Sequence, residues 1–163
     1  MSFLLMRTQD PLSLKSALPD FGKTTHIFLP VNDCRQLDVA EGGSHWSLLL
    51  VSVIDGVAFH YDSMNGGNVS EARLVATRIS QLLGKPLNFI NLEDSPQQEN
   101  GMDCGVYVCL LMQHLLIQRL LKAQAHEKTS MSMRGKEVDA HGGRKEMLRI
   151  IDARRREGEK RRS

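Results

Sequence analysis

The sequence has few of the residues on which several kinds of site depend. Its 163 residues include three cysteines, an odd number, and no two of them form a Cys-x-x-Cys pair. This argues against a zinc site and against a disulfide framework, and it favours a reducing compartment such as the cytoplasm or the nucleus. We expect neither a metal nor a cofactor in this chain.

Long apolar runs and aromatic clusters are also missing. Met1 to Met6 is apolar but short, and Arg7 and Asp10 follow it, so we expect neither a signal peptide nor a membrane span. The basic residues near the C-terminus are not interleaved with aromatic residues, which make up only 5% of the chain. That pattern argues against nucleic-acid binding.

The composition is otherwise that of one soluble globular domain, with 41% hydrophobic and 25% charged residues. Its charge is unevenly placed. Residues 126–163 hold 12 Lys and Arg against 7 Asp and Glu, and the rest of the chain holds 9 against 12. A solvated, frayed C-terminal helix explains this tail best, and a nucleic-acid contact or a nuclear signal is the alternative.

Hydrophobic periodicity predicts an α+β fold, because most of the strands precede most of the helices. We expect an irregular lead over 1–25 and a catalytic core over 26–125. A basic, partly flexible tail over 126–163 should follow, with a helix within 144–157. The core should hold strands over 26–31, 45–54, 57–61 and 87–92, and helices over 69–83 and 103–124. In the first helix, Ser70 is the expected cap and Gly84 the expected stop.

The segment from Ser95 to Val108 is the most informative stretch of the sequence. Polar, turn-forming residues lead into Cys104, where an apolar helical run begins. Unpaired N–H groups and the positive end of the helix dipole favour thiolate over thiol at such a position. Gln98 can donate its amide to an oxyanion, and Cys104 is a candidate nucleophile. The competing interpretation is an inert buried cysteine, the usual state of a free thiol.

The residues beside Cys104 have simple candidate roles. Asp103 can cap the helix, and Gly105 leaves room for a substrate to approach the sulfur. With Trp46, these two residues form the predicted substrate-binding set. Trp46 is either an ordinary core residue or the wall of a narrow slot over the substrate backbone.

A cysteine nucleophile needs a base and a group that orients the base. His45 begins a buried strand after a glycine-rich loop, and Asp62 ends the returning strand of the same hairpin, so Asp62 can hold the His45 imidazole. A two-residue turn at Asp55-Gly56 would set Asp62 opposite Leu49, roughly 13 Å along the strand from His45. A wider loop, a bulge or strand twist must close that gap. His60 is expected to be a surface or sheet-face histidine.

Three motifs resemble the cysteine proteases that process SUMO and the Nedd-type (Rub-like) ubiquitin-like modifiers. They are Gly-Ser-His-Trp-Ser-Leu-Leu at 43–49, His-Tyr-Asp-Ser at 60–63, and Pro-Gln-Gln-Glu-Asn-Gly-Met-Asp-Cys-Gly-Val-Tyr-Val at 96–108. The match covers about residues 24–122. The His-Trp-Ser-Leu-Leu opening and the preceding Gly-Gly look more like the deneddylase branch than the SUMO branch.

The resemblance implies a papain-like fold and a role for each matched residue. Cys104 looks like the nucleophile, His45 the general base and acid, Asp62 its orienting carboxylate and Gln98 the oxyanion donor. Trp46 looks like the tryptophan that covers the Gly-Gly tail of the modifier. Thiolate attack on the glycine carbonyl would give a thioester, which water then hydrolyses.

The resemblance also implies the substrate and the partners. We expect precursor processing and deneddylation of a Nedd-type modifier and its conjugates, such as cullin-type substrates, by a monomer. The alternatives are a SUMO-specific protease and a non-catalytic module that binds such modifiers. An acetyltransferase of a related clan ranks below them, because no phosphate-binding glycine loop is present near Cys104.

The chain departs from the family at its N-terminus. The family has a helical subdomain with a Trp-Leu-Asn-Asp motif before the first core strand, and only about 25 residues without that motif stand there in this chain. We therefore expect the N-terminal subdomain, and part of the modifier-binding surface, to be largely missing.

Overall fold

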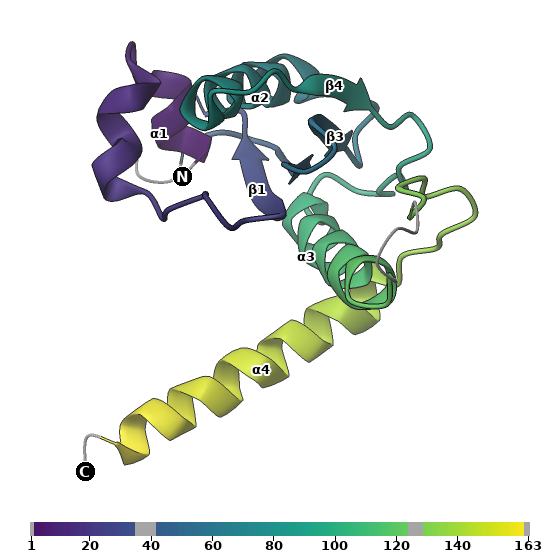
Figure 1. The fold of residues 1–163 in the computed structure, drawn as a ribbon. Helices are drawn as coiled ribbons and strands as arrows, with labels where there is room; N and C mark the ends of the chain where they lie inside the picture. The colour runs from purple at the N-terminus through teal and green to yellow at the C-terminus, as the bar shows by residue number, and fades with distance from the viewer. Residues whose placement is uncertain (1, 35–41, 124–128, 162–163) are drawn as a thin grey trace.

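The computed structural model describes residues 2–34, 42–123 and 129–161 (Figure 1). In chain order the elements are α1 (Ser2–Arg7), the 3-10 helix η1 (Pro11–Ala17), β1 (His26–Asn32), β2 (Trp46–Ser52), β3 (Val57–Tyr61), α2 (Val69–Leu83), β4 (Asn88–Asn91), α3 (Cys104–His114), the π-helical segment η2 (Leu115–Leu120) and α4 (Ala140–Lys160).

The four strands form one mixed sheet in the order β1-β2-β3-β4. β1, β2 and β3 pair antiparallel, and β4 returns parallel to β3 after α2. Pro30 lies in β1, an edge strand, where its missing N–H costs no ladder hydrogen bond. The mixed sheet with flanking helices confirms the predicted α+β class.

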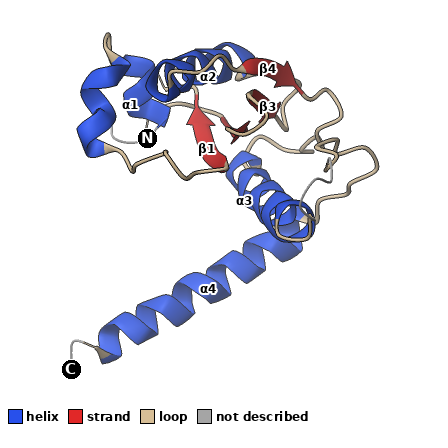
Figure 2. Ribbon diagram, in the orientation of Figure 1, coloured by secondary structure: helices blue, strands red, loops and turns tan. Residues whose placement is uncertain are grey.

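Helices cover both faces of the sheet (Figure 2). Strand alternation sends Leu49 and Val51 of β2 into a core shared with α1 and α2, which includes Leu5 and Ile79. Leu48 and Leu50 point to the other face. There they join Tyr61 and three residues of the α3–η2 helical run: Val108, Leu111 and Leu115. β2 is therefore buried on both sides, as its unbroken apolar run predicts.

Helix α2 has the predicted bounds, and its terminal residues explain them. Gly84 adopts a left-handed conformation with φ of 62°, and its N–H bonds to the carbonyl oxygen of Gln81. The predicted cap is wrong by two residues, because Asn68 occupies the N-cap position and the Ser70 hydroxyl bonds to Glu71 instead.

The β2–β3 hairpin has a wider loop than the predicted two-residue turn. Ser52 pairs with Val57, so four residues, 53–56, connect the strands. Val53 is only 8% exposed and its N–H bonds to the Thr25 carbonyl, on the β1 side of β2, while the pairing of β2 with β3 ends at Ser52. This register places Asp62 just beyond the Leu48–Tyr61 pair and brings it two residues nearer to His45 than a tight turn would.

The two ends of the chain carry more structure than the sequence suggested. The irregular lead holds two helical segments, α1 and η1, and Leu5 of α1 is fully buried. Beyond residue 128 the chain returns to the core, where Met133 is 1% exposed and the Met131 carbonyl accepts a hydrogen bond from the Tyr61 hydroxyl. The predicted C-terminal helix begins earlier, at Ala140. Among the described residues, no helix has the length and apolar character needed to cross a membrane.

Candidate active site

Cys104 is the first residue of α3, where the sequence placed it. The N-terminal N–H groups of a helix have no intrahelical partner, so the peptide dipoles present positive potential at this end. Cys104 is 7% exposed, and neither it nor Cys34 or Cys109 is in a disulfide. A thiol in this position can be stabilised as thiolate by the helix that it begins.

The backbone of His45 is held by hydrogen bonds with three residues. The His45 N–H donates to the Asp33 carboxylate over 3.0 Å. The His45 carbonyl oxygen accepts from the side-chain amides of Asn32 and Asn68, each over 3.2 Å, and from the Asp33 N–H. These bonds fix the point at which the chain enters β2, and thereby the base of the imidazole.

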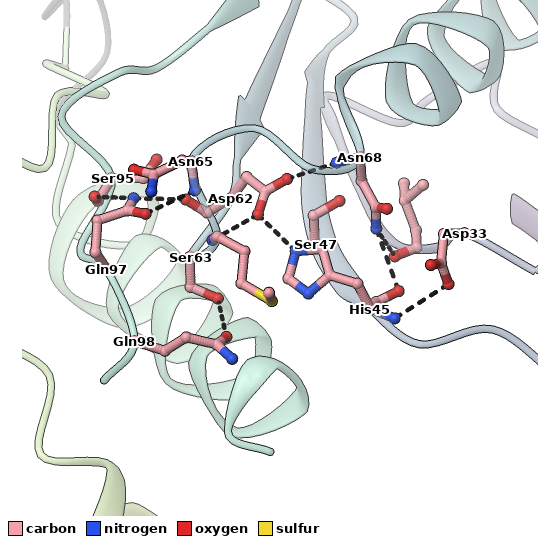
Figure 3. A network of polar contacts seen from close by, with 12 residues as sticks. Asp33, His45, Ser47, Asp62, Ser63, Asn65, Asn68, Ser95, Gln97 and Gln98 are labelled. Atoms are coloured by element: carbon pink, nitrogen blue, oxygen red, sulfur yellow. Dashed lines mark hydrogen bonds and ion pairs between the residues drawn. The ribbon is translucent and has the colours of Figure 1, made fainter. Parts of the chain in front are cut away.

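The His45 ring points at Asp62, as Figure 3 shows. Nε2 of His45 lies 2.6 Å from Oδ1 of Asp62, and both side chains are buried. Because a carboxylate only accepts, Nε2 must carry the hydrogen of this bond. The other ring nitrogen, Nδ1, is buried and has no hydrogen-bond partner among the residues that the structure describes. In the neutral ring Nδ1 is therefore a free acceptor, which is what a general base requires.

Asp62 stays ionised although it is buried. Burial alone would raise the pKa of its carboxyl, but backbone N–H groups of Asn68 and Met64 donate to it over 2.8 Å each, and the His45 ring adds a third bond. Together these bonds lower the pKa of Asp62 below its ordinary value. The charge that orients His45 is thus maintained at neutral pH.

The loop before α3 joins Asp62 to the start of that helix. Gln97 donates its side-chain amide to the Asp62 carbonyl over 2.9 Å, and its own carbonyl accepts from the Tyr107 hydroxyl over 3.1 Å. The backbone N–H of Gln98 donates to the Ser63 carbonyl over 2.9 Å. Tyr107 lies one turn beyond Asp103, so these bonds bring the Cys104 end of α3 toward the His45–Asp62 pair.

The predicted oxyanion donor lies in this loop. Oε1 of Gln98 accepts from the Ser63 hydroxyl over 2.7 Å (Figure 3). Nε2 of Gln98 donates to the Asn100 carbonyl over 2.5 Å. The side-chain amide of Gln98 has two N–H groups, and the bond to the Asn100 carbonyl uses one of them.

The three predicted substrate-binding residues differ in their surroundings. Trp46 is 43% exposed, which excludes the core alternative. A Cβ added to Gly105 would meet nothing within 4 Å, so the space beside it is open. Asp103 occupies the N-cap position, but its side chain makes no capping bond. The predicted capping role is therefore wrong; the carboxylate instead contacts Asn100 and Arg144.

Sequence reasoning missed the residues that support His45 and Asp62. Asp33, Asn68 and Gln97 hold the pair, yet short polar residues in loops give no signal that distinguishes them from turn formers. One signal was available in the Gly42-Gly43 pair. Gly43 has φ of 90°, and a Cβ there would lie 2.2 Å from Oδ1 of Asn32, so only glycine fits this turn.

Of the two positions predicted for His60, on the surface or on a sheet face, only the surface position is wrong. Its side chain is fully buried, hydrogen-bonded to Asn91 at 2.8 Å and to Ser47 at 2.9 Å. Nε2 of His60 also lies 4.0 Å from Oδ2 of Asp62. Burial lowers the pKa of His60, so it is a neutral neighbour of the Asp62 carboxylate.

Comparison with known proteins gives a family match over most of the chain. The model of the Ulp1 protease family, C-terminal catalytic domain, matches residues 10–142. NEDD8-specific protease 2 of Schizosaccharomyces pombe is 38% identical over 152 residues, which is 93% of this chain and 36% of the relative. NEDD8-specific protease 1 of the same yeast is 33% identical over 87% of this chain and 34% of its own length. The chain thus spans about a third of these relatives.

Solved structures agree on the fold. The SUMO protease Ulp1, with its catalytic cysteine oxidised to a sulfinic acid, superimposes with a TM-score of 0.50. It is 24% identical and covers 69% of this chain and 51% of its own. At that identity the likeness establishes the fold alone, and it supports the predicted papain-like arrangement of the ubiquitin-like protease type.

Proposed function

The chain belongs to the Ulp1 protease family, and we propose that it is a cysteine isopeptidase and endopeptidase that cleaves after the C-terminal Gly-Gly of a Nedd-type modifier. The observation that carries the proposal is the His45 ring, bound to buried Asp62 through Nε2 and free at Nδ1. The names of the two fission-yeast relatives favour the Nedd-type modifier over SUMO.

The proposed reaction has two halves. His45 takes the thiol proton at Nδ1, and the Cys104 sulfur attacks the glycine carbonyl carbon. The N–H donors near Gln98 and the start of α3 stabilise the oxyanion. The C–N bond then breaks, and the leaving amine takes the proton from His45. Water, deprotonated by the same imidazole, attacks the thioester, the C–S bond breaks, and the thiolate returns.

Two observations support a site for a narrow glycine tail. Trp46 adjoins His45 and is 43% exposed, so its indole is available to lie over an extended peptide. Gly105 adjoins Cys104 and leaves open space on that side of the sulfur. Because Gly-Gly has no side chains, it is the narrowest tail that could pass beside the indole and the sulfur.

We extend the proposal to the conjugates and the setting of the protein. The conjugates would include cullin-type substrates, the enzyme would act as a monomer, and the compartment would be the cytoplasm or the nucleus. The lack of a disulfide among the three cysteines supports a reducing compartment. The predicted division of the chain into a lead, a catalytic core and a tail is also part of this proposal.

A modifier probe tests the function directly. The chain is incubated with a Nedd-type modifier and, separately, with SUMO, each carrying a C-terminal electrophile in place of the scissile bond. We expect a covalent adduct with the Nedd-type probe that disappears in Cys104→Ala. An adduct with SUMO alone would indicate a SUMO protease. Binding of either modifier without an adduct would indicate a non-catalytic module. If the chain neither bound a modifier nor formed an adduct, the proposal would be refuted.

A further inference from the structure

A polar network surrounds Asp103, the residue immediately before Cys104. Asp103 is 8% exposed, and its carboxylate accepts a hydrogen bond from the Asn100 amide over 2.7 Å and forms an ion pair with Arg144. Hydrogen bonds from Asn100 and then Arg144 lower the pKa of Asp103. A fixed negative charge therefore stands next to the candidate nucleophile, and Arg144 is its cationic partner.

The first turn of α4 is fixed against α3, which fixes Arg144. Asp139 caps α4 by accepting from the Gly142 N–H over 2.8 Å. Gly143 is buried so closely against α3 that a Cβ there would lie 2.6 Å from Cδ1 of Leu110. Beyond this turn α4 extends away from the body of the protein (Figure 1). Arg144 thus lies where α4 leaves α3, at the end of its packed turn.

The same network reaches the candidate oxyanion donor. Oδ1 of Asn100 accepts from the N–H groups of Met102 and Asp103, over 2.8 and 3.1 Å. The Asn100 carbonyl accepts from Nε2 of Gln98. The turn over 98–104 is therefore held at one end by Ser63, which bonds to Gln98, and at the other by Arg144.

The electrostatic consequence follows from charge placement. A carboxylate beside a thiolate disfavours the thiolate, and a cation bound to that carboxylate removes most of the effect. The other charged or titratable groups around this point are His45 before β2, Glu99 in the preceding loop and Tyr107 within α3. Burial, and then the negative charges of Glu99 and Asp103, raise the pKa of Tyr107 in the first turns of α3.

We propose that Arg144 is a positioning residue of the active site: it neutralises Asp103 and holds the 98–104 turn, so that Cys104 is kept as thiolate. This inference rests on the proposed function of Cys104. It gives a role to a residue on the basic C-terminal segment, outside the matched family region of 10–142.

The test measures the reactivity of one thiol, not turnover. Iodoacetamide alkylation is followed at pH 7 and across a pH series on the peptide that carries Cys104. We expect Arg144→Met to slow alkylation roughly 3- to 10-fold and to move its pH midpoint upward, because the residue next to Cys104 would then carry an uncompensated negative charge. Arg144→Lys, which keeps the charge, should retain most of the rate. Asp103→Asn combined with Arg144→Met should recover it, because no charge is then left unpaired.

Arg149→Met is the matched control. Arg149 lies on the same helix, is 77% exposed and pairs only with Glu146 among the described residues. It should leave alkylation unchanged. An Arg144→Met rate equal to wild type would refute the inference. Equal slowing in the single and double variants, with a matching fall in thermal stability, would assign Arg144 a purely structural role. A wild-type rate no faster than that of free cysteine would instead refute the proposed function.

Discussion

Replacing Asp62 by asparagine keeps the shape of the side chain and removes the charge that orients His45. In the wild-type protein, Oδ1 accepts from His45 and Met64, and Oδ2 accepts from Asn68. An asparagine has one carbonyl oxygen, so its NH₂ group must face either the His45–Met64 side or the Asn68 N–H. In either orientation, the buried NH₂ group faces another N–H donor and cannot form a hydrogen bond with it.

The size of the effect follows from the bonds that are lost. A hydrogen bond to a charged group contributes about 1.5–3 kcal/mol, and about 1.4 kcal/mol is a factor of ten in rate. Asp62→Asn should therefore reduce kcat/KM on a fluorogenic modifier amide roughly 10- to 100-fold. Because hydrogen bonds hold the pKa of Asp62 low, the carboxylate is charged throughout the neutral range, and the loss should persist from about pH 6 to pH 9.

A matched control lies in the turn of the same hairpin. Asp55 is exposed in the 53–56 loop, so Asp55→Asn should leave kcat/KM within about twofold of wild type. If Asp62→Asn matched this control, with an unchanged melting temperature, the orienting role of Asp62 would be wrong. A fall in stability without a fall in kcat/KM would limit Asp62 to a structural role.

Three further predictions concern the nucleophile, acid stability and the tail. Cys104→Ser should lose nearly all turnover while still binding the modifier, because a hydroxyl lacks the acidity of a thiol; measurable turnover would exclude Cys104 as the nucleophile. Since burial lowers the pKa of His60, the unfolded state binds its proton more readily, and stability should fall as the pH drops below about 6.5; His60→Gln should flatten that part of a urea-unfolding series. Removing 126–163 should lower the free energy of unfolding by at least about 3 kcal/mol, because Met133 burial and the Tyr61 hydrogen bond are lost. Removing only 153–163 should leave the melting temperature unchanged. Equal melting temperatures for the two truncated proteins would contradict the packing argument.

The elements with strong periodicity could be predicted from the sequence. Helix α2 has the predicted bounds, because amphipathic spacing and the Gly84 stop identify it. Strand β3 also has the predicted bounds, because an Asp-Gly pair precedes it. The four-residue loop between β2 and β3 could not be predicted. Val53 and Ile54 continue the apolar run of β2, so nothing in the sequence indicates that its pairing with β3 ends at Ser52.

The candidate site was predictable where chemistry restricts residue type and unpredictable where it does not. A thiol, an imidazole and a carboxylate have few substitutes in nucleophilic catalysis, so Cys104, His45 and Asp62 stood out. Their supports donate or accept ordinary hydrogen bonds, and Asn, Asp, Gln or Ser can each do that. Asp33 and Asn68 could therefore be recognised only once the fold had brought them to the His45 backbone.

The C-terminal segment shows why a composition shift is a poor guide to function. Its excess of basic residues favours the interpretation of 126–163 as a solvated, frayed helix. The fold instead divides the segment by burial. Met133 and Gly143 are buried against the core, whereas Ala153–Lys160 is exposed at every position. Net charge averages over both parts and hides the difference. Only the part that packs against α3 and β3 can influence Cys104, and Arg144 lies in that part.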